Sequence, residues 1–130
     1  RIGLVPDVGS TWLLPRRVGL ARAMELSLLG EKLPAEKALD WGLINRVVDD
    51  GAALDEATKV ARELAAGPTK ALALMRGLYW DSTENVFEDQ LDLEFRTQRI
   101  AGASEDFREG VAAFLEKRPA LFGETASISP

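Results

Sequence analysis

Only one stretch of this sequence is rich in strand-forming residues, and this limits the folds that the chain can adopt. Residues 43–48 read Leu-Ile-Asn-Arg-Val-Val and lie between Gly42 and Asp49, a pattern that predicts one short strand. A single strand cannot form a sheet, so its pairing partner must lie elsewhere, inside or outside this chain. We therefore expect 130 residues of mainly helical structure, enough for one domain but not for two independent cores.

Glycine, proline and capping residues divide the remaining sequence into predicted helices. These cover residues 12–18, 20–29, 34–41, 54–64 and 68–81, followed by a long helix that Ser82 or Thr83 caps and that ends near residue 101, and a last helix that Ser104 caps. Ser10 or Thr11 is expected to cap the first helix. Apolar residues of the fifth and sixth helices spread over more than one face, which predicts that these helices pack against surfaces beyond one small bundle.

The residue types that are missing narrow the possible chemistry. The sequence has no His and no Cys, which excludes a Ser-His-Asp triad, a thiolate nucleophile and a Cys-based zinc site within this chain. Acid–base chemistry must therefore use Asp, Glu, Lys or the single Tyr79. Carboxylate pairs occur without the spacing of a calcium loop, so we expect no metal site.

Charge and hydropathy bear on the partners and the cellular location of the protein. The net charge is −5, from 16 basic and 21 acidic residues, which argues against a nucleic-acid partner. No uncharged run approaches the ~18 residues of a membrane-spanning helix, so we expect no membrane span. The chain opens with Arg1 and shows no charged-then-apolar leader, which predicts no signal peptide and a cytoplasmic location.

Four blocks of the sequence occur in an order and spacing that resemble a known family. They are IGLVPDVGSTWLLPRRVG near the start, ARAMELSLLG and AEKALDWGLINRVVDD further on, and EDFREGVAAFLEKR near the end. Together they resemble the C-terminal half of the enoyl-CoA hydratase/isomerase (crotonase) superfamily, from Ile2 to about Phe122. The resemblance implies an α/β crotonase-like (ClpP/crotonase) fold, of which this chain is the mostly helical C-terminal part with one short strand. Complete members are longer, so we expect a fragment or a truncated relative.

The first block resembles the isomerase branch of the family, which includes the ring-epoxide isomerase of the phenylacetate pathway. Typical hydratases have Gly where this chain has Asp7, and their second carboxylate would fall just before Arg1. The resemblance implies that Asp7 moves a proton between carbons of a thioester. Such a carboxylate must be poorly solvated, and the apolar Val5, Val8 and Trp12 could provide this. On the residues alone, the pattern favours a turn aspartate that satisfies local amides.

Residues around Asp7 are the candidate contacts for an acyl group. They are Val5, Pro6, Gly9, Trp12 and Leu13, with Leu14 as a further member of the apolar cluster. Some of these residues have a structural alternative: Gly9 as a turn glycine with positive φ, and Trp12, Leu13 and Leu14 as plain core residues.

Phe114 and Lys117 near the end are the candidate contacts for the nucleotide of coenzyme A. Family residues that match them reach the adenine and the phosphates, usually on an adjacent subunit, and an aromatic ring beside an ammonium suits a phosphorylated nucleotide. The alternative places Phe114 in the core stripe of the last helix and leaves Lys117 solvated. Arg118 is another candidate phosphate partner.

The resemblance completes the expected organisation. It implies an acyl-CoA enzyme that works through a thioester enolate, with coenzyme A as part of the substrate and no cofactor, assembled as a trimer or hexamer. Residues 1–50 would end the catalytic core and carry the active-site turn, 51–122 would form a helical oligomerisation region, and 123–130 a disordered tail. Enoyl-CoA hydration and a non-catalytic helical assembly module are the alternatives.

Overall fold

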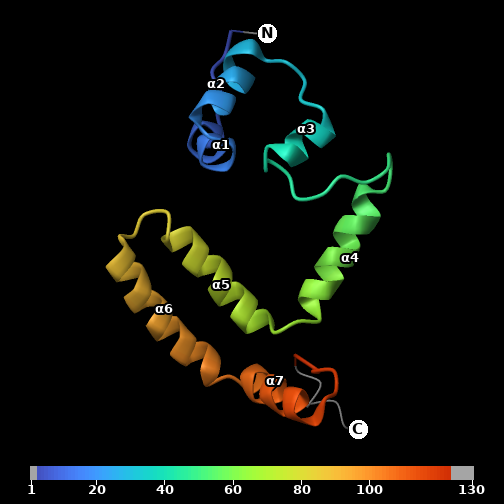
Figure 1. The fold of residues 1–130 in the computed structure, drawn as a ribbon, viewed down its shortest axis with the longest axis vertical. Coiled ribbons are helices and arrows are strands. Elements are labelled where there is room, and N and C mark those ends of the chain that lie inside the picture. Colours follow the sequence, from blue (N-terminus) through green and yellow to red (C-terminus); the bar gives the residue numbers. More distant parts are fainter. Residues whose placement is uncertain (1–2, 124–130) are drawn as a thin grey trace. The chain divides into compact units, whose positions relative to one another are not determined.

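Residues 3–123 are described by a computed structural model, and their regular structure is helical (Figure 1). The helices are α1 (Ser10–Val18), α2 (Leu20–Leu29), α3 (Ala35–Asp40), α4 (Ala53–Ala65), α5 (Thr69–Asp81), α6 (Phe87–Gly102) and α7 (Glu105–Glu116). The chain divides into two compact units, Arg1–Ala53 and Leu54–Pro130, which are treated separately below. The predicted disordered tail lies outside the described residues, except for Gly123.

The first unit is built on the packing of α1 against α2. Gly19 joins the two helices with a φ of 81°, a left-handed value that glycine adopts without strain. Its amide donates to the Pro15 carbonyl oxygen, and its own carbonyl accepts from Ala23. In α3 and its C-terminal cap, the Trp41 ring lies 5.0 Å from the Arg22 guanidinium and 4.6 Å from the Lys37 ammonium. The contact with Arg22 ties α2 to the end of α3, and the contact with Lys37 lies within α3 and its cap.

The predicted strand over residues 43–48 is wrong. Within residues 3–123 no strand is formed, and this segment follows an irregular path. Gly42 ends α3 with a φ of 72°, and the Leu43 amide donates to the Ala38 carbonyl oxygen at 2.9 Å. The first amide of the predicted strand is therefore used to close the preceding helix. A strand also needs a neighbour for its hydrogen bonds, and the described residues provide none.

In the second unit, α5 packs against α6 and α6 against α7. The predicted caps of α6 are wrong: Ser82 Oγ donates to the Tyr79 carbonyl oxygen at 2.8 Å and Thr83 Oγ1 to that of Trp80 at 2.7 Å. Both side chains thus satisfy carbonyl groups at the end of α5, and α6 begins later, with Val86 at its N-cap. Gln90 Nε2 on α6 donates to the Leu78 carbonyl oxygen at 3.2 Å, which links the two helices.

The predicted cap of the last helix is confirmed. Ser104 Oγ accepts a hydrogen bond from the Phe107 amide at 3.1 Å, so one of the unpaired amides at the start of α7 is satisfied. Glu105 and Asp106 occupy the first turn, where the helix dipole favours negative charge.

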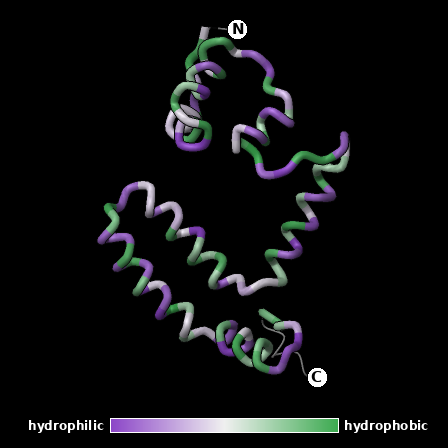
Figure 2. Tube along the Cα trace, viewed as in Figure 1, coloured by the Kyte–Doolittle hydropathy of each residue, from purple (hydrophilic) through white to green (hydrophobic). Residues whose placement is uncertain are grey.

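The described part of the chain buries very little apolar surface. Its buried residues are Val18, Ala23, Ala38 and Ala113. Figure 2 shows hydrophobic residues along the whole length of α5 and α6, interleaved with hydrophilic ones. Large side chains on these helices are exposed, among them Tyr79, Phe87 and Phe95. The helices therefore carry apolar faces that the described residues of their own unit leave exposed, as their sequence pattern predicts.

Candidate functional site

Asp7 lies at the start of a tight turn that leads into α1. Val8 and Gly9 have φ values of 53° and 77°, and the Ser10 amide donates to the Asp7 carbonyl oxygen at 3.0 Å. Positive φ at both central residues defines a type I′ turn. Gly9 thus has the conformation predicted for a turn glycine, but the predicted cap is wrong. Gly9 is the N-cap, without a side-chain cap bond, and Ser10 Oγ donates backwards to the Asp7 carbonyl oxygen at 2.6 Å.

The Asp7 side chain is exposed in this chain. Within residues 3–123, the hydrogen bonds that Asp7 accepts go to its main-chain oxygen, so the turn does not engage the carboxylate. Val5 is 83% exposed and Val8 93%, and Pro6 is exposed as well. The apolar residues expected to keep water away from Asp7 are therefore exposed, and the described residues of the first unit do not enclose the carboxylate.

Val8 carries a backbone strain that its residue type does not predict. A β-branched residue with a φ of 53° lies in a region that costs an L-residue roughly 1–2 kcal/mol. Such outliers cluster at functional sites. The Asp-x-Gly spacing, which is typical of a tight turn, is the sequence signal that could have predicted the positive φ of Val8. The valine at the middle position does not itself indicate a positive φ.

Trp12 and Leu13 follow the turn in the first two turns of α1. Trp12 is half-buried, and the Arg16 guanidinium lies 3.8 Å from the centre of its ring. Arg16 Nη1 also donates to the Trp12 carbonyl oxygen at 3.0 Å. One face of the indole is therefore covered by Arg16 from the next turn of the helix. Leu13 is exposed and Leu14 half-buried.

A groove of about 510 Å³ lies over α5, α6 and α7 in the second unit. Met75, Phe107, Val111, Phe114 and Phe122 are among its mainly apolar lining residues. Phe114 is 82% exposed, so its assignment to a closed core stripe is wrong for the described chain. Its ring is available to a ligand or to another protein surface.

Lys117 ends α7 in the left-handed conformation, with φ 55° and ψ 40°. Its amide donates to the Phe114 carbonyl oxygen at 3.3 Å, and the Arg118 amide donates to that of Ala113 at 3.1 Å. These two bonds make a Schellman motif, in which the left-handed residue is usually glycine. The backbone of Lys117 is therefore tied directly to the turn that carries Phe114.

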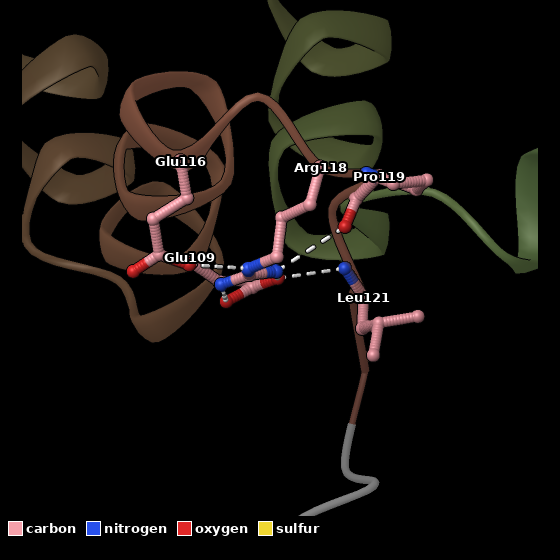
Figure 3. Close-up of polar contacts among 5 residues, drawn as sticks. All are labelled: Glu109, Glu116, Arg118, Pro119 and Leu121. Carbon is pink, nitrogen blue, oxygen red and sulfur yellow. Dashed lines mark hydrogen bonds and ion pairs between the residues drawn. The ribbon is translucent and has the colours of Figure 1, made fainter.

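Arg118 is held by two carboxylates on α7 (Figure 3). Its Nη1 and Nη2 donate to Glu109 Oε1 and Oε2 at 2.6 and 2.9 Å, and its Nε donates to Glu116 Oε2 at 2.6 Å. Glu109 Oε1 also accepts from the Leu121 amide at 2.8 Å. The hydrogen bond from Arg118, with that from Leu121, lowers the pKa of Glu109 from 4.5 to about 2. The same pairing with Glu109 and then Glu116 raises the pKa of Arg118.

This pairing bears on the candidate phosphate contacts. Arg118 is engaged by Glu109 and Glu116, which makes it a structural residue in this chain, whereas Lys117 is exposed. Sequence reasoning missed the role of Glu109, because it lies nine positions from Arg118, outside the spacing of neighbours on one helix. Asp7 and its neighbours belong to the first unit and Phe114 and Lys117 to the second, so each set is described within its own unit.

The described part of the chain shows neither a metal-binding cluster nor a membrane-spanning helix. Residues 3–123 contain no group of three or more acidic side chains arranged to hold a metal ion. Over the same range, no helix has the length and apolar character needed to cross a membrane.

Comparison with known proteins defines the family. The enoyl-CoA hydratase/isomerase family model matches residues 1–125. The chain therefore belongs to the enoyl-CoA hydratase/isomerase family.

Individual members of the family are similar to this chain over almost its whole length. The 1,2-epoxyphenylacetyl-CoA isomerase of Escherichia coli is 52% identical over 122 residues, which are 94% of this chain and 47% of that protein. A trans-2-decenoyl-(acyl-carrier-protein) isomerase of Streptococcus mutans is 34% identical, over 93% of this chain and 46% of that protein. The crystal structure of an enoyl-CoA hydratase from a Polaromonas species has a TM-score of 0.89 at 36% identity, over 94% of this chain and 48% of that one. The chain thus spans about half the length of the relatives it matches.

Proposed function

We propose that this chain is the C-terminal part of an acyl-CoA isomerase that moves a proton through a thioester enolate, with Asp7 carrying the proton. The single observation that supports this most strongly is the 52% identity to 1,2-epoxyphenylacetyl-CoA isomerase. The type I′ turn adds to it, because it presents the Asp7 carboxylate outward at the start of α1. Double-bond isomerisation in the degradation of fatty or aromatic acids is the reaction class.

The chemistry needs one carboxylate that takes a proton from one carbon and returns it at another. Asp7 is suited to this role because the turn engages its main-chain oxygen and leaves the side chain available. Val5 and Val8, both exposed here, would line the acyl pocket with Pro6, Gly9, Trp12 and Leu13 once another part of the protein covers them. Donors to the enolate oxygen are the largest catalytic contribution in such reactions, and we assign them to the N-terminal half that the relatives have.

The nucleotide of the substrate would be bound by Phe114 and Lys117. The Phe114 ring is 82% exposed and can stack on an adenine, while the Lys117 ammonium can pair with a phosphate. Lys117→Ala should then raise KM for acyl-CoA and leave KM for acyl-pantetheine unchanged, because the shorter thioester lacks the nucleotide. An equal rise for both substrates would contradict the assignment.

The remaining features of the proposal follow from the resemblance to the family. The enzyme would be a cytoplasmic trimer or hexamer that needs no cofactor. Residues 1–50 would end the catalytic core, and 51–122 would form the oligomer contacts. Enoyl-CoA hydration is the alternative within the same chemistry. A non-catalytic assembly module is the alternative from another class, favoured by the exposed apolar faces of α5 and α6.

The test of the proposed function is Asp7→Asn in the full-length protein, assayed for double-bond isomerisation of an acyl-CoA. Asparagine keeps the shape of the side chain but cannot carry the proton, so the rate should fall by roughly 100- to 10,000-fold. Asp40→Asn is the matched control, because Asp40 is an exposed aspartate at the end of α3 in the same unit and the variant should keep the parent rate. Isomerisation at the parent rate by Asp7→Asn would contradict the proposal.

A further inference from the structure

The segment after α7 folds back on the helix it leaves. Lys117 reverses the chain with a φ of 55°, and Leu121 then donates its amide to Glu109, two turns before the end of α7. Two residues further on, the Gly123 amide donates to Asp106 Oδ1 at 3.4 Å. Residues 118–123 therefore lie along α7, antiparallel to it.

Phe122 fixes this returning segment from its apolar side. A Cβ atom placed on Gly110 would lie 3.6 and 3.8 Å from two carbons of the Phe122 ring, which puts the ring directly over the glycine. Phe122 and Phe114 both line the groove of about 510 Å³. The position of the returning segment thus helps to form the surface on which Phe114 is exposed.

The polar side of the segment depends on one carboxylate. Both oxygens of Glu109 are occupied, Oε1 by Arg118 Nη1 and the Leu121 amide, and Oε2 by Arg118 Nη2. A paired hydrogen bond of this kind needs the planar guanidinium, and a lysine could not reproduce it. The Glu109 side chain is 25% exposed and that of Arg118 37%, so water competes only partly with the pair.

Lys117 needs support of this kind. It occupies the left-handed position of a Schellman motif, which favours glycine because other L-residues are strained there. The residues on both sides of Lys117 are anchored: Glu116 to Arg118 Nε at 2.6 Å, and Arg118 to Glu109. The strained backbone is thereby held between two fixed points.

We propose that Glu109 and Arg118 are positioning residues for the nucleotide of the acyl-CoA substrate: their paired hydrogen bonds hold the chain that follows Lys117 against α7 and so fix Lys117 beside the turn that carries Phe114. This inference rests on the proposed nucleotide contact of Lys117 and Phe114. It assigns to Glu109 and Arg118 no contact with the substrate itself.

The test compares two thioesters in the full-length protein. Glu109→Gln should raise KM for an acyl-CoA roughly tenfold, less than the ~100-fold that a misplacement of 1 Å can cost at a reacting centre. It should leave kcat and the KM for the matching acyl-pantetheine unchanged. Glu105→Gln is the matched control, since Glu105 is an exposed glutamate in the first turn of α7, and it should leave all of these values unchanged.

One further variant separates positioning from general stability. Arg118→Lys keeps the charge and loses the paired hydrogen bond, so its KM for acyl-CoA should still rise. Arg118→Lys therefore tests the proposal even where Glu109→Gln lowers the yield of folded protein.

The outcomes distinguish this inference from the proposed function. A rise in KM for both thioesters in Glu109→Gln, or no rise for either, would overturn the positioning role. If Lys117→Ala affects acyl-CoA selectively while Glu109→Gln does not, the nucleotide contact stands and the positioning role fails. If Lys117→Ala has no selective effect, the nucleotide contact itself is refuted, and the positioning role with it.

Discussion

Replacing Lys117 by glycine should stabilise α7 while weakening the binding of acyl-CoA. Lys117 has φ 55° and ψ 40°, a conformation that costs an ordinary L-residue roughly 1–2 kcal/mol. Glycine adopts this conformation without strain, but it makes the unfolded chain more flexible, which lowers the free energy of unfolding by about 0.5–1 kcal/mol. The net gain in the free energy of unfolding of α7 should therefore be about 0.5–1 kcal/mol.

The assay is urea-dependent hydrogen exchange of the amides of the substituted helix, which is α7 for Lys117→Gly and α4 for the matched control Lys59→Gly. Lys59 is an exposed lysine inside α4, where glycine should destabilise the helix by about 1 kcal/mol. The same substitution is thus expected to have opposite signs at the two positions. Equal destabilisation at both would show that Lys117 is not held in the left-handed conformation. A stabilised Lys117→Gly protein that binds acyl-CoA as tightly as the parent would refute the view that the lysine is kept for binding.

Three further predictions concern the helices and the assembly. Ser104→Ala should destabilise α7 by about 1 kcal/mol through loss of the cap bond to the Phe107 amide; unchanged exchange of the first α7 amides would contradict this. Because the pKa of Glu109 is lowered from 4.5 to about 2, the stability that its pairing contributes should be present above pH 4.5 and be lost as the pH falls towards 2. An NMR titration of the Leu121 amide measures this, and a midpoint at the ordinary value would contradict it. The 130-residue chain alone should self-associate through the exposed apolar faces of α5 and α6, and a monomer by light scattering over a wide concentration range would refute this. The same chain should catalyse no proton exchange on a thioester, and measurable exchange would refute that.

The helix boundaries could be predicted because they depend on local chemistry. Gly19 and Gly30 end α1 and α2 with positive φ, and Ser104 caps α7 through its own hydroxyl. Where two local solutions compete, the sequence does not decide between them. Ser82 and Thr83 could cap a following helix or close a preceding one, and they do the latter.

Features that depend on distant residues could not be predicted. The segment 43–48 has the composition of a strand, but its pairing requires a neighbour that residues 3–123 do not supply. The pairing of Glu109 with Arg118 exists only because the chain reverses at Lys117, and a left-handed lysine leaves no mark in a sequence. Asp7 was identified as the candidate proton carrier from its motif, but its environment depends on whatever surface covers Val5 and Val8.

The most direct test of the central claim is the exchange of solvent deuterium into the carbon beside the thioester carbonyl of an acyl-CoA. This measurement follows the proton that Asp7 is proposed to move, without depending on which product is formed. The full-length protein should incorporate deuterium at that carbon, Asp40→Asn should match it, and Asp7→Asn should be slower by roughly 100-fold or more. Incorporation by Asp7→Asn at the parent rate would show that another group moves the proton, and would contradict the account.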